Sequence, residues 1–168
     1  MKPPFDHSGL VAVHAEAAGL SGPALLALMQ AVLAKGKLFR FQAPGSSMHP
    51  FIRNGDILTL APLKTRPAAG DVLAFRYPSR GNVVVHRAVQ VRHAACLMRG
   101  DASPGEADGW VPFEHILGRV VHIQRGKQQL HFGLGPERRL IAFLSNRGWL
   151  LPLQSSALLR TLGKMIVR

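Results

Sequence analysis

The fold class is decided by residues 83–91, which read Val83-Val84-Val85-His86-Arg87-Ala88-Val89-Gln90-Val91. Valine dominates this stretch, and β-branched side chains favour the extended backbone of a strand. The stretch therefore predicts a β-strand with His86 near its middle. Because side chains alternate along a strand, His86 is expected on one face and the other face receives Val83, Val85, Arg87, Val89 and Val91.

Further runs of alternating or β-branched residues lie on both sides of this strand, at 38–43, 56–61, 71–77, 95–99, 117–125 and 127–132. Turn-forming residues separate them, as in Asn54-Gly55-Asp56, Ala69-Gly70-Asp71 and Arg125-Gly126-Lys127. With the strand over 82–92, seven short strands at this spacing predict a compact antiparallel β domain. The predicted fold class is mainly β.

A helix is expected before the first strand. Ser21 is a suitable N-cap, Pro23 suits the first turn, and Gly36 suits the C-terminal stop. Between these residues, an apolar helical face is formed by Leu25, Leu26, Leu28, Met29, Val32 and Leu33. Residues 1–20 are small and polar in places and are expected to be loosely ordered. The main domain is then expected over 21–134, with this helix leading it.

The last segment, 135–168, loses the strand pattern and mixes basic with large apolar residues. It predicts two short basic amphipathic helices, broken near Gly148 and Pro152. Three interpretations stay open: a helical pair packed on the β domain, an interfacial membrane anchor, or an arm that binds nucleic acid. The charges that suit a surface are those of Arg138, Arg139, Arg147, Arg160, Lys164 and Arg168.

The composition limits the classes of partner. The chain has 168 residues, enough for one domain, and its formal net charge is +12. Such a charge fits nucleic acid, an anionic membrane surface or a solvated basic exterior. Aromatic residues are only 7% of the chain, and no basic motif is interleaved with them, which argues against nucleic acid. Peripheral contact with a membrane remains a possible interaction.

No secretory signal or membrane span is expected. The N-terminus lacks a basic-then-apolar layout, and the best apolar run, 24–34, is far shorter than the ~18 residues that a span needs. We therefore expect a cytoplasmic protein. Cys96 is the single cysteine, so no intramolecular disulfide can form, and His93 three residues before it has no partner pair for a metal. Phosphate-binding glycine loops are also missing, so we expect no cofactor.

Three weak patterns in order carry the candidate chemistry. Ser47 lies on a glycine-preceded turn, where a hydroxyl can project freely and backbone N–H groups can face an oxyanion. A serine nucleophile needs a base, and His86 is 39 residues further on. An acidic loop after the next strand contains Asp101 and Asp108, either of which could orient a histidine.

Together with neighbouring motifs, these residues resemble the signal peptidase I and repressor-type autoprotease superfamily. The resemblance covers about 37–125. It rests on five ordered motifs: Gly45-Ser46-Ser47-Met48-His49-Pro50 with Gly55-Asp56, Gly70-Asp71-Val72-Leu73-Ala74-Phe75, Val85-His86-Arg87-Ala88-Val89, Arg99-Gly100-Asp101, and Leu117-Gly118-Arg119-Val120-Val121.

The resemblance implies a β-rich serine endopeptidase. It makes Ser47 the nucleophile and His86 the base, as in the Ser-His branch typical of the endoplasmic-reticulum enzymes, where arginine follows the histidine. Asp101 matches the family's Gly-Asp position, and Asp108 lies about one residue from its second aspartate, so both remain candidates. The oxyanion would be held by backbone N–H groups, those of Ser47 and Ser46.

The chain departs from the signal peptidases in two respects. Gly45 stands two residues before the nucleophile, where those enzymes usually have a hydroxyl donor, and no transmembrane anchor is found. We therefore expect an endopeptidase that cleaves a leader or precursor segment rather than ordinary secretory preproteins. The alternatives are a regulator that cleaves itself, for which Ala18-Gly19 is a suitable bond, and a non-catalytic binding module on the same fold.

Overall fold

The computed structural model describes residues 10–11, 22–77, 82–102, 107–147 and 149. Its elements, in chain order, are β1 (Leu10–Val11), α1 (Gly22–Ala34), β2 (Leu38–Gln42), β3 (Ile57–Ala61), β4 (Val72–Arg76), β5 (Val83–Arg92), β6 (Ala95–Arg99), β7 (Gly109–Pro112), the 3-10 turn η3 (Phe113–His115), β8 (Ile116–Arg125), β9 (Gln128–Leu130) and α2 (Arg138–Asn146). The mainly β fold class is therefore confirmed, with α1 before β2 and α2 after β9.

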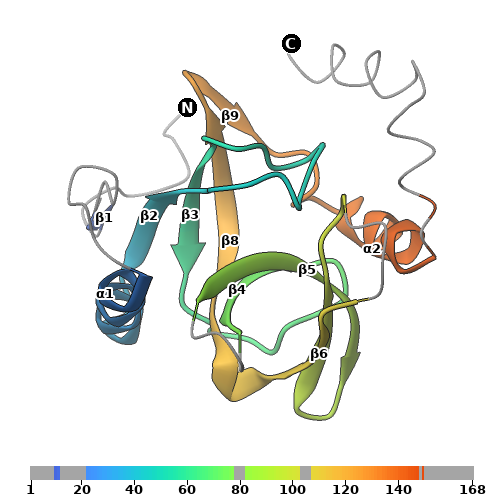
Figure 1. Cartoon of the computed structure of the whole chain (residues 1–168), viewed down its shortest axis with the longest axis horizontal. Coiled ribbons are helices and arrows are strands. Elements are labelled where there is room, and N and C mark those ends of the chain that lie inside the picture. Colours follow the sequence, from blue (N-terminus) through green and yellow to red (C-terminus); the bar gives the residue numbers. More distant parts are fainter. Residues whose placement is uncertain (1–9, 12–21, 78–81, 103–106, 148, 150–168) are drawn as a thin grey trace, which may run out of the picture.

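The strands form one sheet whose order is β1-β2-β3-β8-β4-β5-β6-β7, with β9 paired to β8. Every described pairing is antiparallel except that of β1 with β2. β8 is the central strand, since it pairs with β3, β4 and β9 along its length (Figure 1). The sequence did not predict β1 and β7, because two and four residues are too few for a recognisable alternation.

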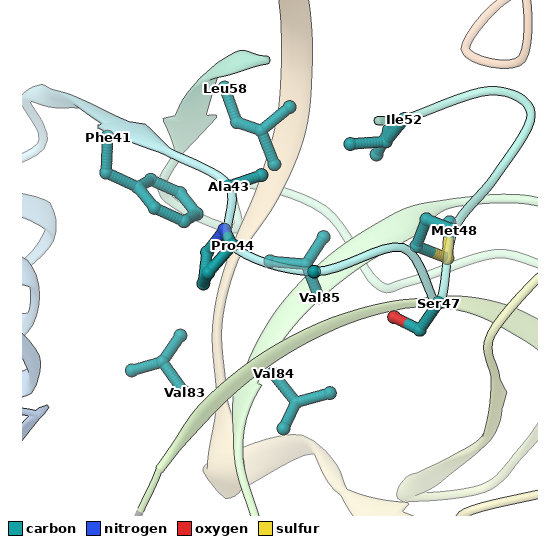
Figure 2. A pocket seen from close by; sticks show the side chains of 11 residues that line it. Phe41, Ala43, Pro44, Ser47, Met48, Ile52, Leu58, Val83, Val84 and Val85 are labelled. Atoms are coloured by element: carbon teal, nitrogen blue, oxygen red, sulfur yellow. The ribbon is translucent and has the colours of Figure 1, made fainter. Parts of the chain in front are cut away.

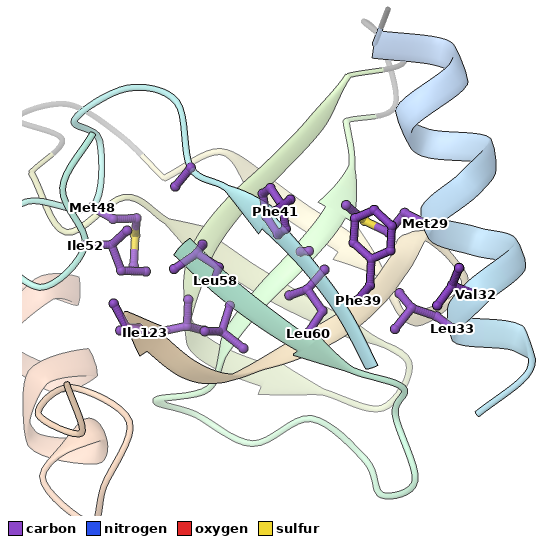
Figure 3. Packing of buried hydrophobic residues seen from close by; sticks show 14 residues of the cluster. Met29, Val32, Leu33, Phe39, Phe41, Met48, Ile52, Leu58, Leu60 and Ile123 are labelled. Atoms are coloured by element: carbon purple, nitrogen blue, oxygen red, sulfur yellow. The ribbon is translucent and has the colours of Figure 1, made fainter. Parts of the chain in front are cut away.

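Strand β4 is buried on both faces and divides the core into two clusters. Val72 and Ala74 join the cluster under α1, whereas Leu73 and Phe75 join a second cluster with residues of β5, β6 and β7. Figure 3 shows the first cluster, in which side chains of α1 meet those of β2 and β3. The adjacent strand β5 likewise contributes side chains to both clusters.

Helix α1 follows the predicted apolar face and stop. Met29, Val32 and Leu33 are buried against the sheet. The helix ends in a Schellman motif, in which the Gly36 N–H donates to the Leu33 carbonyl and the Lys37 N–H donates to the Val32 carbonyl. Gly36 has φ +73°, a conformation that glycine adopts without strain. Ser21, the predicted N-cap, lies outside the described residues.

The predicted alternation along β5 holds as far as Ala88 and then breaks. Val83 and Val85 pack on the first cluster, and Val84 and Ala88 pack on the second. A bulge between Ala88 and Gln90 shifts the register against β6, so Val91 reaches the second cluster rather than the face predicted for it. The bulge lies beyond His86 and Arg87, and the opposite faces predicted for these two residues are retained.

The C-terminal segment contributes one described helix. α2 buries Ile141, Ala142 and Ser145, and Ile141 packs with Phe51 from the loop after β2. The first of the two predicted helices is thus packed on the β domain, and the second lies outside the described residues. Within the described part of the chain, no helix is long and apolar enough to cross a membrane.

Candidate active site

Ser47 lies in the loop that connects β2 to β3. The two ends of this loop are held together, because the Ala43 N–H donates to the Asp56 carbonyl at 2.8 Å and the Gly55 N–H donates to the Ala43 carbonyl at 3.0 Å. Met48 and Ile52 are both 4% exposed and insert into the core cluster under α1. These anchors hold the loop against the sheet while the Ser47 side chain stays at the surface.

A buried carboxylate stabilises the base of the same loop. Asp56 accepts hydrogen bonds from the Arg53 N–H at 2.8 Å and from the Nε and Nη2 of Arg125 at 2.9 and 2.7 Å. Arg125 also donates to the Phe51 carbonyl. Strand β8, which was predicted over 117–125, is thereby tied to the loop that positions Ser47.

His86 lies in the middle of β5, which has β4 on one side and β6 on the other. It is opposite Leu73 in the β4 ladder, and its ring centroid is 6.3 Å from that of Phe75. The residue is 7% exposed. A side chain on a paired, central strand with an aromatic wall has little freedom to turn away, which suits a general base.

The imidazole of His86 joins Ser47 and Asp108 in one line. Its Nε2 is 2.9 Å from the Ser47 Oγ, and its Nδ1 is 2.5 Å from the Asp108 Oδ2. A carboxylate can only accept, so Nδ1 carries the proton and donates to Asp108. Nε2 then presents its lone pair to the Ser47 hydroxyl, which donates. This is the arrangement in which a histidine can remove a proton from a serine.

Asp108 is positioned by the strand that follows it. Its backbone N–H donates to the Met98 carbonyl at 2.8 Å, and β7 continues this pairing with Met98 opposite Gly109. The hydroxyl of Tyr77 donates to the Asp108 carbonyl at 3.5 Å. The Asp108 side chain is 22% exposed, so its carboxylate is partly solvated as well as hydrogen-bonded.

The structure places Asp101, the other predicted carboxylate, against Arg87 instead. Its Oδ1 is 2.9 Å from the Arg87 Nε and its Oδ2 is 2.7 Å from Nη2, and both side chains are fully buried. Arg87 also donates through Nη1 to the carbonyls of Gly70 and Gly133. His86 and Arg87 are consecutive residues of one strand, so they face opposite sides and take different aspartates.

Asp101 nevertheless contributes to the site through the backbone. The next residue, Ala102, donates its N–H to the Ser47 carbonyl at 2.8 Å. The buried ion pair therefore helps to hold the loop that carries Ser47. Sequence reasoning gave Arg87 no role beyond the resemblance, although a charged residue among valines in a central strand indicates a buried partner.

The predicted oxyanion donors are Ser46 and Ser47. Among the hydrogen bonds of the described residues, none is donated by the backbone N–H of either serine. Gly45 has φ +86° and its N–H donates to the Asn54 Oδ1 at 3.0 Å, which fixes the turn before the two serines. A glycine is well suited to this position because other residues rarely adopt that φ.

A pocket of about 200 Å³ opens beside Ser47. Figure 2 shows Ser47 at one end of it, with the valines of β5 facing the segment that carries Ala43 and Pro44. Most of the lining residues are apolar, none is charged, and they come from β2, β3, the Ser47 loop and the start of β5. Such a pocket can accept an apolar side chain next to the serine hydroxyl.

One further histidine, His49, lies close to Ser47 in the sequence. Partial burial lowers the pKa of His49, and the positive charges of Arg53 and Arg125 lower it further. His49 is thus neutral at neutral pH and adds no positive charge beside Ser47. No cluster of three His, Cys, Asp or Glu side chains that could hold a metal ion occurs in the described part of the chain.

Comparison with protein-family models, with curated proteins and with solved structures finds no match to this chain.

Proposed function

We propose that the chain is a serine endopeptidase of the signal-peptidase-like kind, in which Ser47 is the nucleophile, His86 the general base and Asp108 the residue that orients the histidine. The observation that carries the proposal is the continuous line from the Ser47 Oγ through both nitrogens of His86 to the Asp108 carboxylate. A surface serine can be solvated by water, so its stability in the loop does not require hydrogen bonds to a buried histidine and an aspartate. The exposed Ser47 hydroxyl lies beside a pocket lined mostly by apolar residues, where a substrate side chain can bind next to it.

The reaction follows from these groups. As the Ser47 Oγ attacks the scissile carbonyl carbon, its proton moves to the His86 Nε2, and Asp108 stabilises the imidazolium that forms. The carbonyl oxygen becomes an oxyanion that accepts from the backbone N–H groups of Ser46 and Ser47. His86 then gives the proton to the leaving amine, and an acyl-serine remains. Water, deprotonated by His86, hydrolyses this ester and restores the serine.

The substrate that fits this site is an extended peptide. Residues 83–86 of β5 pair with β4, but the pairing with β6 begins only at Arg87, so their other edge meets no strand in the described residues. A peptide laid along this edge can form backbone hydrogen bonds and place a side chain in the pocket between the start of β5 and the Ser47 loop. A leader or precursor segment with apolar residues before the scissile bond is the substrate class we propose.

The experiment is cleavage of a fluorogenic library of extended peptides, analysed by mass spectrometry. We expect wild-type protein to cut peptides with a small apolar residue before the scissile bond and to spare those with Asp there, because no cationic side chain lines the pocket to pair with a carboxylate. Ser47→Ala should lose the activity. Ser46→Ala is the matched control and should retain it, since the change keeps the backbone N–H.

Two outcomes would refute the proposal. One is the absence of any cut by wild-type protein across the library, and the other is equal cutting by Ser47→Ala. The intact mass of the incubated protein tests the self-cleaving alternative, which requires a fragment that ends at Ala18; the Ala18-Gly19 bond lies outside the described residues.

A further inference from the structure

Helix α2 has apolar residues on two faces, and only one of them is buried. Ile141 and Ala142 face the β domain, whereas Leu140 is 60% exposed and Phe143 is 49% exposed. Trp149, just after the helix, is 53% exposed. Large apolar side chains so close together at a surface indicate contact with something other than water.

The same surface is strongly basic. Arg139 and Arg147 are exposed and lie four residues on either side of Phe143, which places all three on one helix face. The guanidinium of Arg147 lies over the rings of Phe143 and Trp149, with its Cζ 4.8 and 5.8 Å from their centroids. Residues 138–149 contain no Asp or Glu.

We propose that this surface, formed by Arg139, Leu140, Phe143, Arg147 and Trp149 and called here the α2 surface, docks on an anionic lipid bilayer. A helix that lies in the interface plane uses a few apolar side chains for shallow insertion and basic residues for the headgroups. Tryptophan and arginine are both suited to the depth of the headgroups. A second copy of the chain is a poor partner, because two such surfaces carry like charge on proteins of net charge +12.

The helix that carries the α2 surface is anchored to the β domain. On its inner side, Ile141 packs with Phe51, which is four residues after Ser47. Arg87 donates to the carbonyl of Gly133, in the segment that leads into α2. Among the described residues, the helix is therefore held to the β domain by contacts that leave its outer face exposed, and docking requires no rearrangement of the Ser47 loop.

The test uses the full-length chain and vesicles of phosphatidylcholine, alone or in an equimolar mixture with phosphatidylglycerol. The chain has two tryptophans, so Trp110→Phe leaves Trp149 as the single reporter. We expect its fluorescence to shift to shorter wavelength with the anionic vesicles, weakly or not at all with phosphatidylcholine alone, and to return as salt is raised.

Variants locate the contact. Leu140→Glu with Phe143→Glu should abolish binding, and Arg139→Gln with Arg147→Gln should weaken it roughly tenfold or more at low salt. Lys35→Gln with Lys37→Gln removes the same charge at the end of α1, on the opposite side of the molecule (Figure 1), and should have a much smaller effect. All changed residues are exposed, so thermal unfolding should be unaltered.

Three results would overturn the proposal. They are no shift of Trp149 emission with anionic vesicles, equal weakening by the α1 and α2 charge changes, or lipid-free self-association that Leu140→Glu with Phe143→Glu abolishes, which would make the surface a protein interface. Vesicle binding by Ser47→Ala and cleavage of soluble peptides by the α2 variants keep this proposal and the peptidase proposal separate.

Discussion

Two adjacent residues of β5, His86 and Arg87, each contact a different aspartate, and the two contacts differ in their exposure to water. His86 takes Asp108 on one face of β5, in a line that ends at an exposed serine, and the Asp108 side chain is 22% exposed. Arg87 takes Asp101 on the other face, where neither side chain is exposed at all. The first pair includes a histidine, which can gain or lose a proton near neutral pH. The second pair holds a buried arginine, which stays charged, against a buried carboxylate.

The difference in solvation suits the different roles that we propose for the two pairs. A partly solvated carboxylate can stabilise a transient positive charge on a histidine without a large change in the protein. A fully buried ion pair is costly to separate, so it fixes the backbone on both sides of it. Through Ala102 and through the carbonyls of Gly70 and Gly133, the Arg87 pair connects the Ser47 loop to the segment before α2. The comparison predicts that activity and stability can be lost independently.

The largest expected effect is on the proposed peptidase activity. Asp108→Asn should lower kcat/KM about 10⁴-fold, because an amide at this position can hold the wrong tautomer of His86. Its free energy of unfolding in urea should stay within about 1 kcal/mol of wild type, since the side chain is partly exposed and its neighbours remain. A loss of stability as large as that of an Asp101 variant would contradict the division of roles.

The second effect is on stability. Asp101→Asn should lower the free energy of unfolding by about 3–5 kcal/mol, because the Arg87 charge is left buried without its partner. The measurement is urea denaturation followed by circular dichroism.

The control is the double change Arg87→Met with Asp101→Leu, which removes both charges. It should be more stable than Asp101→Asn, and it remains informative if the single variant does not fold. If the double change is equally damaging, the buried charge is not the cause.

A smaller effect is expected where the buried pair meets α2. Gly70→Ala should cost about 1–3 kcal/mol, because Gly70 has φ +99° and an added Cβ would lie 2.7 Å from the Arg138 carbonyl oxygen. Gly126→Ala is the matched control: Gly126 has φ +58° with open space around it, so only backbone strain is added. Equal unfolding midpoints for the two variants would contradict close packing of α2 on the turn at Gly70, which precedes β4.

The smallest effect is a pH dependence on the face that carries His86. Burial raises the pKa of the Cys96 thiol to about 11, and the charge of Asp71 adds to this. Because the unfolded thiol ionises near 9 and the folded one near 11, its stabilising contribution is complete below pH 9 and is lost as the pH rises toward 11. At pH 10 the loss is about 1 kcal/mol.

The measurement is the free energy of unfolding of wild-type protein and Cys96→Ala at pH 8 and pH 10. The difference between the two proteins should change by that amount, and alkylation of native Cys96 at pH 8 should be slow. Rapid alkylation, or a difference that is independent of pH, would mean that this face of the sheet is open to water.

Local patterns determined most of the fold. The valine-rich run at β5, the Gly-Asp turns and the apolar face of α1 are encoded within a few residues each, so the sequence predicted every described strand except β1 and β7, together with the leading helix and the stop at Gly36. The turn of Ser47 and the strand position of His86 are local properties too, but each was a weak pattern alone, and the two residues were singled out through the order of the motifs and the resemblance they support.

Only the tertiary structure decided between Asp101 and Asp108. The two residues lie in one loop, and their partners depend on pairing between β6 and β7, which places Asp108 beside His86 and turns Asp101 toward Arg87. β7 is too short to be predicted, and register between strands is a long-range property that no local pattern encodes. The sequence also could not predict which apolar face of α2 is buried and which is exposed. Large apolar residues lie all around this helix, so the pattern does not indicate which side packs on the sheet.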